Sequence, residues 1–181
     1  MSFISKNSFL FRKHLRLKEF DYSSPNFYFV TVCTKNREKI FIPKVDPKYT
    51  NESTIVAAAS YAAKNTHIAE NNLLDLSRKY FNNLIIDFYC FMSDHMHFII
   101  GFEGIVAKKG AIGSRSYSLA NIITIYKSLV SRDIGIPCWQ PNYYEHITRS
   151  EQSLNRIRNY ILNNPSVEYE KIPWKTIDPA V

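Results

Sequence analysis

Four stretches of the chain carry the apolar pattern that is typical of β-strands. The first is FYFVTVCT, residues 27–34, where aromatic and β-branched residues follow one another. LIIDFYCFM and HMHFIIGF lie on either side of the turn-like pair Ser93-Asp94, and this arrangement predicts a β-hairpin. The fourth stretch, NYYEHIT at residues 142–148, is a shorter strand candidate.

Glycine, proline and charged residues mark the connections between these strands. KNREKIFIPKVDPKYT follows the first strand and predicts a loop, because prolines and charges interrupt its apolar residues. Gly101 and Gly104 are expected to end the second strand of the hairpin. The basic segment AKKGAIGSRS then predicts another loop.

Apolar residues at helical spacing predict the first of three helices. The pattern runs from Ala69 to Tyr80 at intervals of three and four residues. Either Asn65 or Thr66 would serve as the N-cap, and the helix is expected to end near the Asn82-Asn83 pair.

The second and third helices carry clearer end signals. Ser118 precedes a regular apolar stripe that ends at Gly135, and these two residues predict the cap and the end of the second helix. Ser150 caps the third, which stops at about Asn164 because Pro165 disfavours helical geometry at the residue before it.

The element order is βαββαβα, which predicts an α+β, ferredoxin-like fold: an antiparallel sheet with helices packed on one face. With 181 residues, 45% of them hydrophobic, the chain suits a single domain over residues 1–181. Residues 1–24 would form a basic N-terminal arm, and residues 166–181 a C-terminal tail.

The net charge of +7 is concentrated toward the two ends of the chain. The first 20 residues hold five basic residues and one acidic residue, and residues 101–181 hold ten basic and seven acidic. Residues 21–100 are balanced. The N-terminal arm and the loop with Lys108, Lys109 and Arg115 would suit a polyanion, although a solvated basic face explains the pattern equally well.

The sequence also limits the class of protein. It holds no unbroken apolar run of membrane-spanning length and no leader pattern, so we expect a cytoplasmic protein with no membrane partner. The three cysteines, Cys33, Cys90 and Cys138, are widely spaced in apolar surroundings. They are expected to be buried free thiols.

His95 and His97 stand two residues apart in a predicted strand, so their side chains project to the same face. Two imidazoles in this arrangement can hold one divalent cation if another element supplies a third ligand. On its own, the spacing is more often found in two ordinary strand histidines.

The third predicted helix contains a possible complement to this pair. Tyr160 and Asn164 stand at i and i+4, hence on one helix face, beside the apolar stripe. An amide oxygen can bind a cation, and a phenol can act as a nucleophile. The alternative is that Tyr160 is a core aromatic and Asn164 a helix stop.

Taken in order, the motifs resemble a known family, the single-tyrosine, single-strand DNA transposases with a histidine-hydrophobic-histidine (HUH) box. FMSDHMHFII resembles that box and NYILNNP resembles the tyrosine helix. The similarity is greatest to the REP-associated tyrosine transposases and their insertion-sequence relatives. RLKEFDYSSPNFYFVTVCTKNREKIF resembles their opening, and CWQPNYYEHITRSEQSLNRIRNYILNNP resembles their C-terminal signature.

This resemblance covers most of residues 12–166, and the chain departs from the family pattern in places. Ser93-Asp94 stands where the family usually has proline-asparagine; both pairs suit a turn. Pro141 replaces a commonly basic residue. Residues 50–64 and 104–117 match nothing in the family pattern.

The resemblance implies that His95, His97 and Asn164 hold Mg²⁺ or Mn²⁺ and that Tyr160 is the nucleophile. It implies a metal-dependent endonuclease and strand transferase that cleaves hairpin-associated single-stranded DNA through a 5′-phosphotyrosine intermediate, without a nucleotide cofactor. It also implies a homodimer acting on DNA of the bacterial nucleoid.

Single-stranded or hairpin DNA is the expected partner, because basic grooves follow phosphates and aromatic side chains stack on bases. Two alternatives remain: a domesticated hairpin-DNA-binding protein without transposition activity, and a structural zinc module. The candidate DNA contacts are Arg12, Lys13, Arg16, Lys18, Arg149, Arg156 and Arg158.

Overall fold

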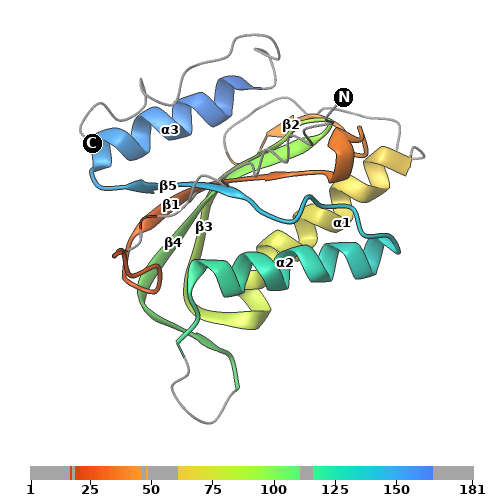
Figure 1. Cartoon of the computed structure of the whole chain (residues 1–181). Coiled ribbons are helices and arrows are strands. Elements are labelled where there is room, and N and C mark those ends of the chain that lie inside the picture. The colour runs from red at the N-terminus through yellow and green to blue at the C-terminus, as the bar shows by residue number, and fades with distance from the viewer. Residues whose placement is uncertain (1–16, 18, 46–47, 49–60, 111–115, 165–181) are drawn as a thin grey trace, which may run out of the picture.

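A five-stranded antiparallel sheet with strand order β2-β3-β4-β1-β5 organises the protein (Figure 1). The computed structural model describes residues 17, 19–45, 48, 61–110 and 116–164. The strands are β1 (Phe27–Cys33), β2 (Lys44–Val45), β3 (Phe81–Phe91), β4 (His95–Lys108) and β5 (Tyr144–Thr148). The helices are α1 (Tyr61–Asp75), α2 (Leu119–Ile134) and α3 (Glu151–Asn163), with short helical segments η1 (Lys35–Arg37) and η3 (Leu76–Tyr80). The predicted α+β, ferredoxin-like order is confirmed, with β2 as an addition.

The β3–β4 hairpin turns at Ser93-Asp94, as predicted, and places Cys90 of β3 opposite His97 of β4. The expectation that Gly101 and Gly104 end the second strand is wrong, because β4 continues to Lys108. Gly104 has a φ of 124°, a conformation that favours glycine, and the strand passes through it without ending.

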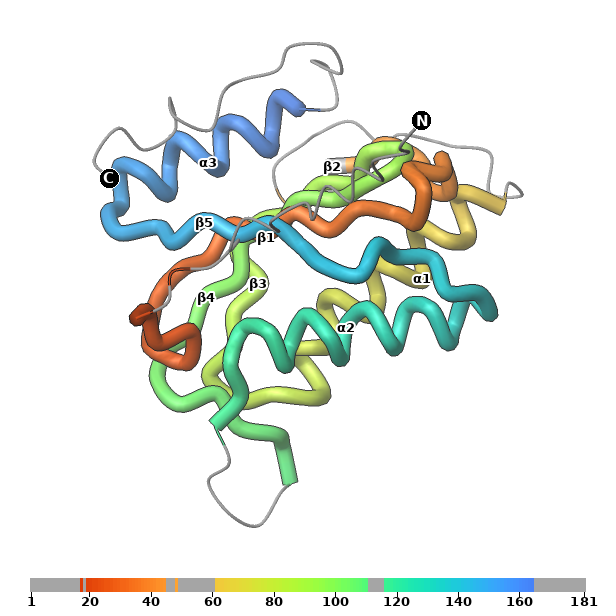
Figure 2. Tube along the Cα trace, viewed as in Figure 1, coloured from red at the N-terminus to blue at the C-terminus, as the bar shows by residue number. Residues whose placement is uncertain are grey.

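One face of the sheet packs against α1 and α2, which lie side by side at the lower right in Figure 2. The Tyr126 hydroxyl of α2 donates a hydrogen bond to the Ala69 carbonyl of α1 at 3.2 Å and so links the two helices. Alternate residues of the central strands supply the buried side chains on this face: Tyr28, Val30 and Val32 of β1, and Met96, Phe98 and Ile100 of β4.

The opposite face of the sheet packs against α3 (Figure 1). The apolar stripe of α3, formed by Leu154, Ile157 and Ile161, forms one buried cluster with side chains of three strands, namely Phe29, Phe88, Cys90 and Ile99. The prediction that the helices pack on one face is therefore wrong in this respect. The physical reason is that the central strands are apolar on both faces, so each face needs a cover.

The boundaries of the first helix also differ from the prediction. Asn65 and Thr66 are not its N-cap, because α1 already includes Tyr61. Their polar groups bond the preceding segment instead: the Asn65 amide donates to the Ile40 carbonyl, and the Thr66 hydroxyl accepts the Ile42 N–H. The helical segment ends at Tyr80, and residues 82–83 belong to β3.

The predicted end signals of the other two helices are confirmed. Ser118 and Asn121 form a reciprocal capping box at the start of α2, and Gly135 ends it with a φ of 90°. Ser150 caps α3 by accepting the Ser153 N–H, and Asn164 is the C-cap that follows the last helical residue, Asn163. None of the helices in the described parts of the chain is long and apolar enough to cross a membrane.

Candidate active site

The two histidines of the HxH motif lie on the face of β4 that α3 covers. Met96 between them points to the other face, where it is fully buried beside α2. The ring centroids of His95 and His97 are 4.8 Å apart, and the rings are nearly perpendicular. The predicted common face of the two imidazoles is therefore confirmed.

His97 is held in place from the neighbouring strand. Thr31 is its cross-strand partner on β1, and the Thr31 hydroxyl lies 2.7 Å from His97 Nδ1. Only 4% of His97 is exposed, and its ring stacks on Phe29 at 5.3 Å. Burial, with smaller contributions from the charges of His95 and Arg37, lowers the pKa of His97 well below its ordinary value. His97 is therefore a neutral imidazole, the form that binds metal ions.

His95 is held by the residue that precedes it. Its Nδ1 lies 2.5 Å from Asp94 Oδ1, and the other carboxylate oxygen of Asp94 lies 3.4 Å from Arg37 Nε. In both histidines, then, Nδ1 has a partner on the protein. The ring nitrogen that each would offer to a cation is Nε2.

Tyr160 projects from α3 toward this pair. Its ring centroid lies 5.6 Å from that of His97 and 6.0 Å from that of Phe29. Burial, then the nearby Cys90, raise the pKa of Tyr160, and the Asn164 side chain lowers it by a smaller amount. At neutral pH the side chain is a phenol, so it needs help to act as a nucleophile. Cys90 is not a competing nucleophile, because burial raises the pKa of its thiol to about 12.

Asn164 lies one turn after Tyr160, at the end of α3. Its Nδ2 is buried and has no hydrogen-bond partner. The same side chain interacts with the Tyr160 phenol and lowers its pKa, so turning Oδ1 toward a cation would change that contact.

The two histidines supply two candidate imidazole ligands, and among the described residues no group of three or more His, Cys, Asp or Glu side chains could hold a metal ion. For a divalent cation to bind here, an amide or a non-protein ligand would have to complete the set. Two imidazole nitrogens and one amide oxygen suit Mn²⁺ better than Mg²⁺, which prefers oxygen ligands.

The seven basic residues predicted to contact DNA differ in their surroundings. Arg12, Lys13, Arg16 and Lys18 lie outside the described residues. Arg156 is exposed on α3. Arg158 forms two 2.8 Å contacts with Asp87 of β3 and a 3.0 Å contact with Glu151, so its charge already stabilises the docking of α3.

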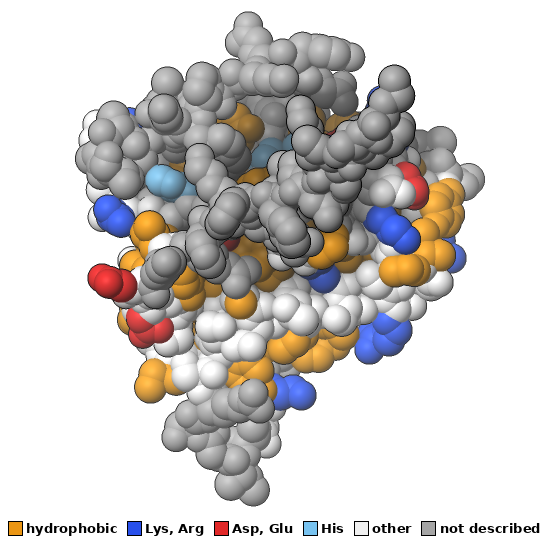
Figure 3. Space-filling view, in the orientation of Figure 1, with side chains coloured by type: hydrophobic (Ala, Val, Ile, Leu, Met, Phe, Trp, Pro, Cys, Tyr) orange, Lys and Arg blue, Asp and Glu red, His pale blue; other side chains and the backbone are white. Residues whose placement is uncertain are grey.

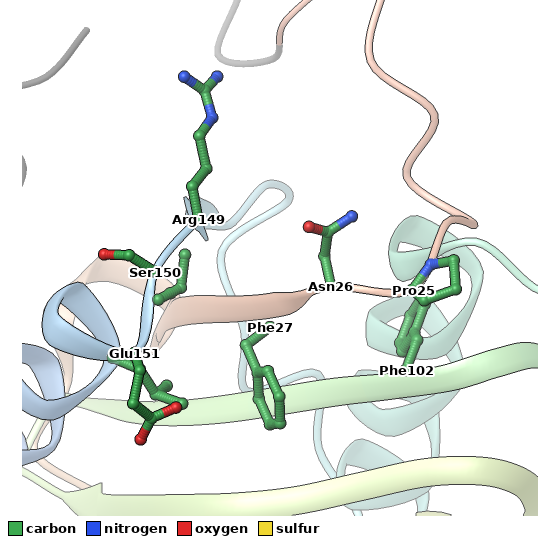
Figure 4. A pocket seen from close by; sticks show the side chains of 9 residues that line it. Pro25, Asn26, Phe27, Phe102, Arg149, Ser150 and Glu151 are labelled. Atoms are coloured by element: carbon green, nitrogen blue, oxygen red, sulfur yellow. The ribbon is translucent and has the colours of Figure 1, made fainter.

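Arg149 is exposed at the start of α3, beside an open hollow of about 310 Å³. The hollow is also lined by Asn26 and Phe27 at the start of β1, and Figure 4 shows the Arg149 and Asn26 side chains extending to the same side. On the face shown in Figure 3, the described Lys and Arg side chains are scattered and form no single patch.

Tyr143 and Tyr144, at the start of β5, have opposite surroundings. Tyr143 is buried in the cluster beneath α2, whereas Tyr144 is 50% exposed. Neither of them takes the place of Tyr160 beside the histidines.

Sequence reasoning missed the residues that support the histidines. Thr31 is a polar residue in the middle of an apolar strand, and this was the available signal for it. Asp94 was assigned only a turn role, and Arg37 only a loop. Their participation depends on the approach of residues 34–41 to the hairpin turn, which no local pattern encodes. All three described cysteines are buried free thiols, as expected.

Comparisons with known proteins bear on the family and the fold of the chain. No family model matches the chain. An uncharacterised protein of Haemophilus influenzae is 30% identical over 172 residues, which span 85% of this chain and 88% of that protein.

Two solved structures are similar in fold. One is a REP-associated tyrosine transposase bound to a REP hairpin, with a TM-score of 0.50 and 15% identity; the match covers 84% of this chain and 73% of the other. The second is a candidate transposase from Deinococcus radiodurans, with 16% identity, 82% of this chain and 95% of the other covered. Its TM-score of 0.39 is too low to support an argument.

Proposed function

This chain belongs to the same family as the uncharacterised Haemophilus influenzae protein and has the fold of a REP-associated tyrosine transposase, and from this premise we propose that it cleaves and rejoins single-stranded DNA. The proposed enzyme is a Mg²⁺- or Mn²⁺-dependent endonuclease and strand transferase. The observation that supports it most is the grouping of Tyr160 with His95 and His97 on one face of the sheet.

Tyr160 is the proposed nucleophile. Its Oη attacks the phosphorus of the scissile phosphodiester, and the bond between phosphorus and the 3′ oxygen breaks. The phenol proton passes to solvent, and the departing 3′ oxygen takes up a proton. The products are a 5′-phosphotyrosine on the protein and a free 3′-hydroxyl.

Rejoining is the reverse of this step. A 3′-hydroxyl attacks the phosphotyrosine and releases the Tyr160 side chain. The phosphodiester energy is conserved in the protein–DNA bond, so strand transfer needs no nucleotide cofactor.

The chain's own residues prepare the site for this chemistry. Phe29 meets the ring of Tyr160 edge-on and limits its orientation. Thr31 and Asp94 hold the two imidazoles. A divalent cation bound by His95, His97 and Asn164 would supply the positive charge that neutralises the phosphate and favours the phenolate.

The test is incubation of the protein with labelled single-stranded hairpin DNA and Mn²⁺ or Mg²⁺. Wild type is expected to form a covalent adduct that survives denaturation, whereas Tyr160→Phe and His95→Ala are not. An adduct that persists in Tyr160→Phe would overturn the assignment of the nucleophile. Hairpin binding by wild type without any adduct would favour a DNA-binding protein without cleavage activity.

We further propose that the active form is a homodimer. Sedimentation at several protein concentrations, with and without hairpin DNA, tests this directly. A monomer under every condition would exclude it.

A further inference from the structure

The Asp94 carboxylate contacts His95, and the turn that contains Asp94 does not require this contact. A turn at this position requires only that the chain reverse direction between β3 and β4. Here the Asp94 carboxylate also lies 2.5 Å from the Nδ1 of the next residue, His95. The second carboxylate oxygen faces Arg37 Nε at 3.4 Å. Three side chains thus form a chain of contacts that ends at one candidate metal ligand.

The main chain around Asp94 is fixed independently of its side chain. The Asp94 carbonyl accepts hydrogen bonds from both the N–H and the hydroxyl of Thr34, each at 2.9 Å. The preceding carbonyl, of Ser93, accepts the Phe41 N–H at 3.1 Å. Because these bonds use backbone carbonyls, the turn does not depend on the carboxylate. The carboxylate is available for another role.

Arg37 is held in a restricted backbone conformation. It and Asn36 have φ values of 59° and 53°, in the left-handed region that residues other than glycine seldom adopt. Arg37 contacts two groups on the histidine face of the sheet, the Asp94 carboxylate and the Cys33 sulfur at 3.1 Å. Since half of the Arg37 side chain is exposed, its own contribution is reduced by solvent screening.

The two histidines therefore have unlike partners. A neutral hydroxyl, from Thr31, holds Nδ1 of His97, whereas a carboxylate holds Nδ1 of His95. A carboxylate accepts only, so it fixes the His95 proton on Nδ1 and leaves the lone pair on Nε2. Carboxylate partners of this kind orient metal-binding histidines and make them better donors.

We propose that Asp94, backed by Arg37, is a positioning residue that fixes the His95 tautomer and so increases the affinity of the site for Mn²⁺ or Mg²⁺. This proposal rests on the metal-binding part of the proposed function. An asparagine at this place could fulfil the role only in part, because an amide oxygen carries no charge.

The first test is made on the metal-free, full-length protein, so that it does not depend on catalysis. Long-range ¹H–¹⁵N NMR distinguishes the two imidazole tautomers. Wild type and Asp94→Asn are expected to show the His95 proton on Nδ1, whereas Asp94→Ala is expected to show a mixture or a change to Nε2. An unchanged Nδ1 tautomer in Asp94→Ala would refute the proposal.

The second test measures Mn²⁺ binding without DNA by titration calorimetry. Asp94→Ala is expected to weaken binding about 10- to 100-fold, with Asp94→Asn in between. Asp75→Asn is the matched control, because it removes a carboxylate from an exposed ion pair with Lys79 and should leave affinity unchanged. Equal affinity in wild type and Asp94→Ala would also refute the proposal.

These outcomes separate the positioning role from the proposed activity. Wild type that binds no Mn²⁺ would overturn the metal dependence even if the His95 tautomer responds to Asp94 as expected. Wild type that binds Mn²⁺ tightly but forms no DNA adduct would overturn only the cleavage function. Equal thermal melting of the Asp94 variants and wild type would show that the turn is intact, as its backbone bonds predict.

Discussion

Tyr160 and His97 lie with their ring centroids 5.6 Å apart, although one projects from a helix and the other from the sheet beneath it. Neither residue is held by the other. His97 is fixed by Thr31 and Phe29, and Tyr160 by the packing of α3. The contact therefore depends on the docking of α3 against the sheet.

The Tyr160 phenol should ionise above the ordinary value of about 10 in the metal-free protein. Burial disfavours the charged phenolate and so raises the pKa of the folded state above that of the unfolded state. The resulting stabilisation is complete below pH 10 and is lost as the pH rises toward the folded pKa. Ultraviolet difference titration of wild type against Tyr160→Phe isolates the ionisation of this phenol. A midpoint below pH 9.5, roughly half a unit under the ordinary value, would contradict the expected rise in the pKa.

Replacing Thr31 by valine should destabilise the protein. The two side chains have similar shapes, but the change leaves Nδ1 of the buried His97 without its hydroxyl partner, at a cost of about 1–3 kcal/mol. Urea unfolding gives the free energy directly. Thr124→Val is the control, since its hydroxyl bonds only the Ala120 carbonyl on an exposed helix surface and should change stability by less than about 0.5 kcal/mol. Equal losses in the two variants would count against the Thr31–His97 bond.

Replacing Arg149 or Arg158 by alanine should affect two different properties, DNA binding and stability respectively. Arg158→Ala removes the paired contacts to Asp87 and should lower the free energy of unfolding by about 1–3 kcal/mol. Arg149→Ala should leave stability unchanged but weaken hairpin DNA binding and reduce its salt dependence by about one unit of slope.

The same two variants can be compared in one set of binding curves at increasing salt concentration. If Arg149→Ala binds hairpin DNA as wild type does at every concentration, the residue does not contact phosphate. A large loss of DNA binding in Arg158→Ala, with stability unchanged, would instead place its guanidinium on DNA.

Gly101→Ala should destabilise the sheet. An added Cβ would lie 2.5 Å from Cε1 of Phe27, the residue opposite Gly101 on β1, and a rigid aromatic ring cannot yield easily. The expected cost is about 1–3 kcal/mol in urea unfolding. Phe27→Leu in the same chain should recover part of the loss by removing the ring; no recovery would mean that the strain lies in the backbone.

Strand and helix positions could be predicted from the sequence wherever one local signal decided them. The capping residues Ser118 and Ser150 and the turn at Ser93-Asp94 are of this kind, and all are confirmed. The alternation that puts His95 and His97 on one face also follows from strand geometry alone.

The rest depended on tertiary contacts. The face on which α3 packs could not be predicted, because the central strands are apolar on both sides and offer two equivalent surfaces. The start of α1 was misplaced because Asn65 and Thr66, which look like caps, satisfy the backbone of residues 40–42. The Asp94–Arg37 contact joins the β3–β4 turn to η1, and the spacing of these residues in the sequence does not reveal it.

The position of α3, the only described helix on its face of the sheet, has a consequence for folding. The cluster beneath α3 is small and separate from the larger one that α1 and α2 share, so the larger part of the core can persist while α3 detaches. Amide hydrogens of α3 should then exchange with solvent through a partial opening that leaves α2 protected. Each such opening would carry Tyr160 and Asn164 away from the two histidines, so the assembled site would exist only for the fraction of time that this one helix is docked.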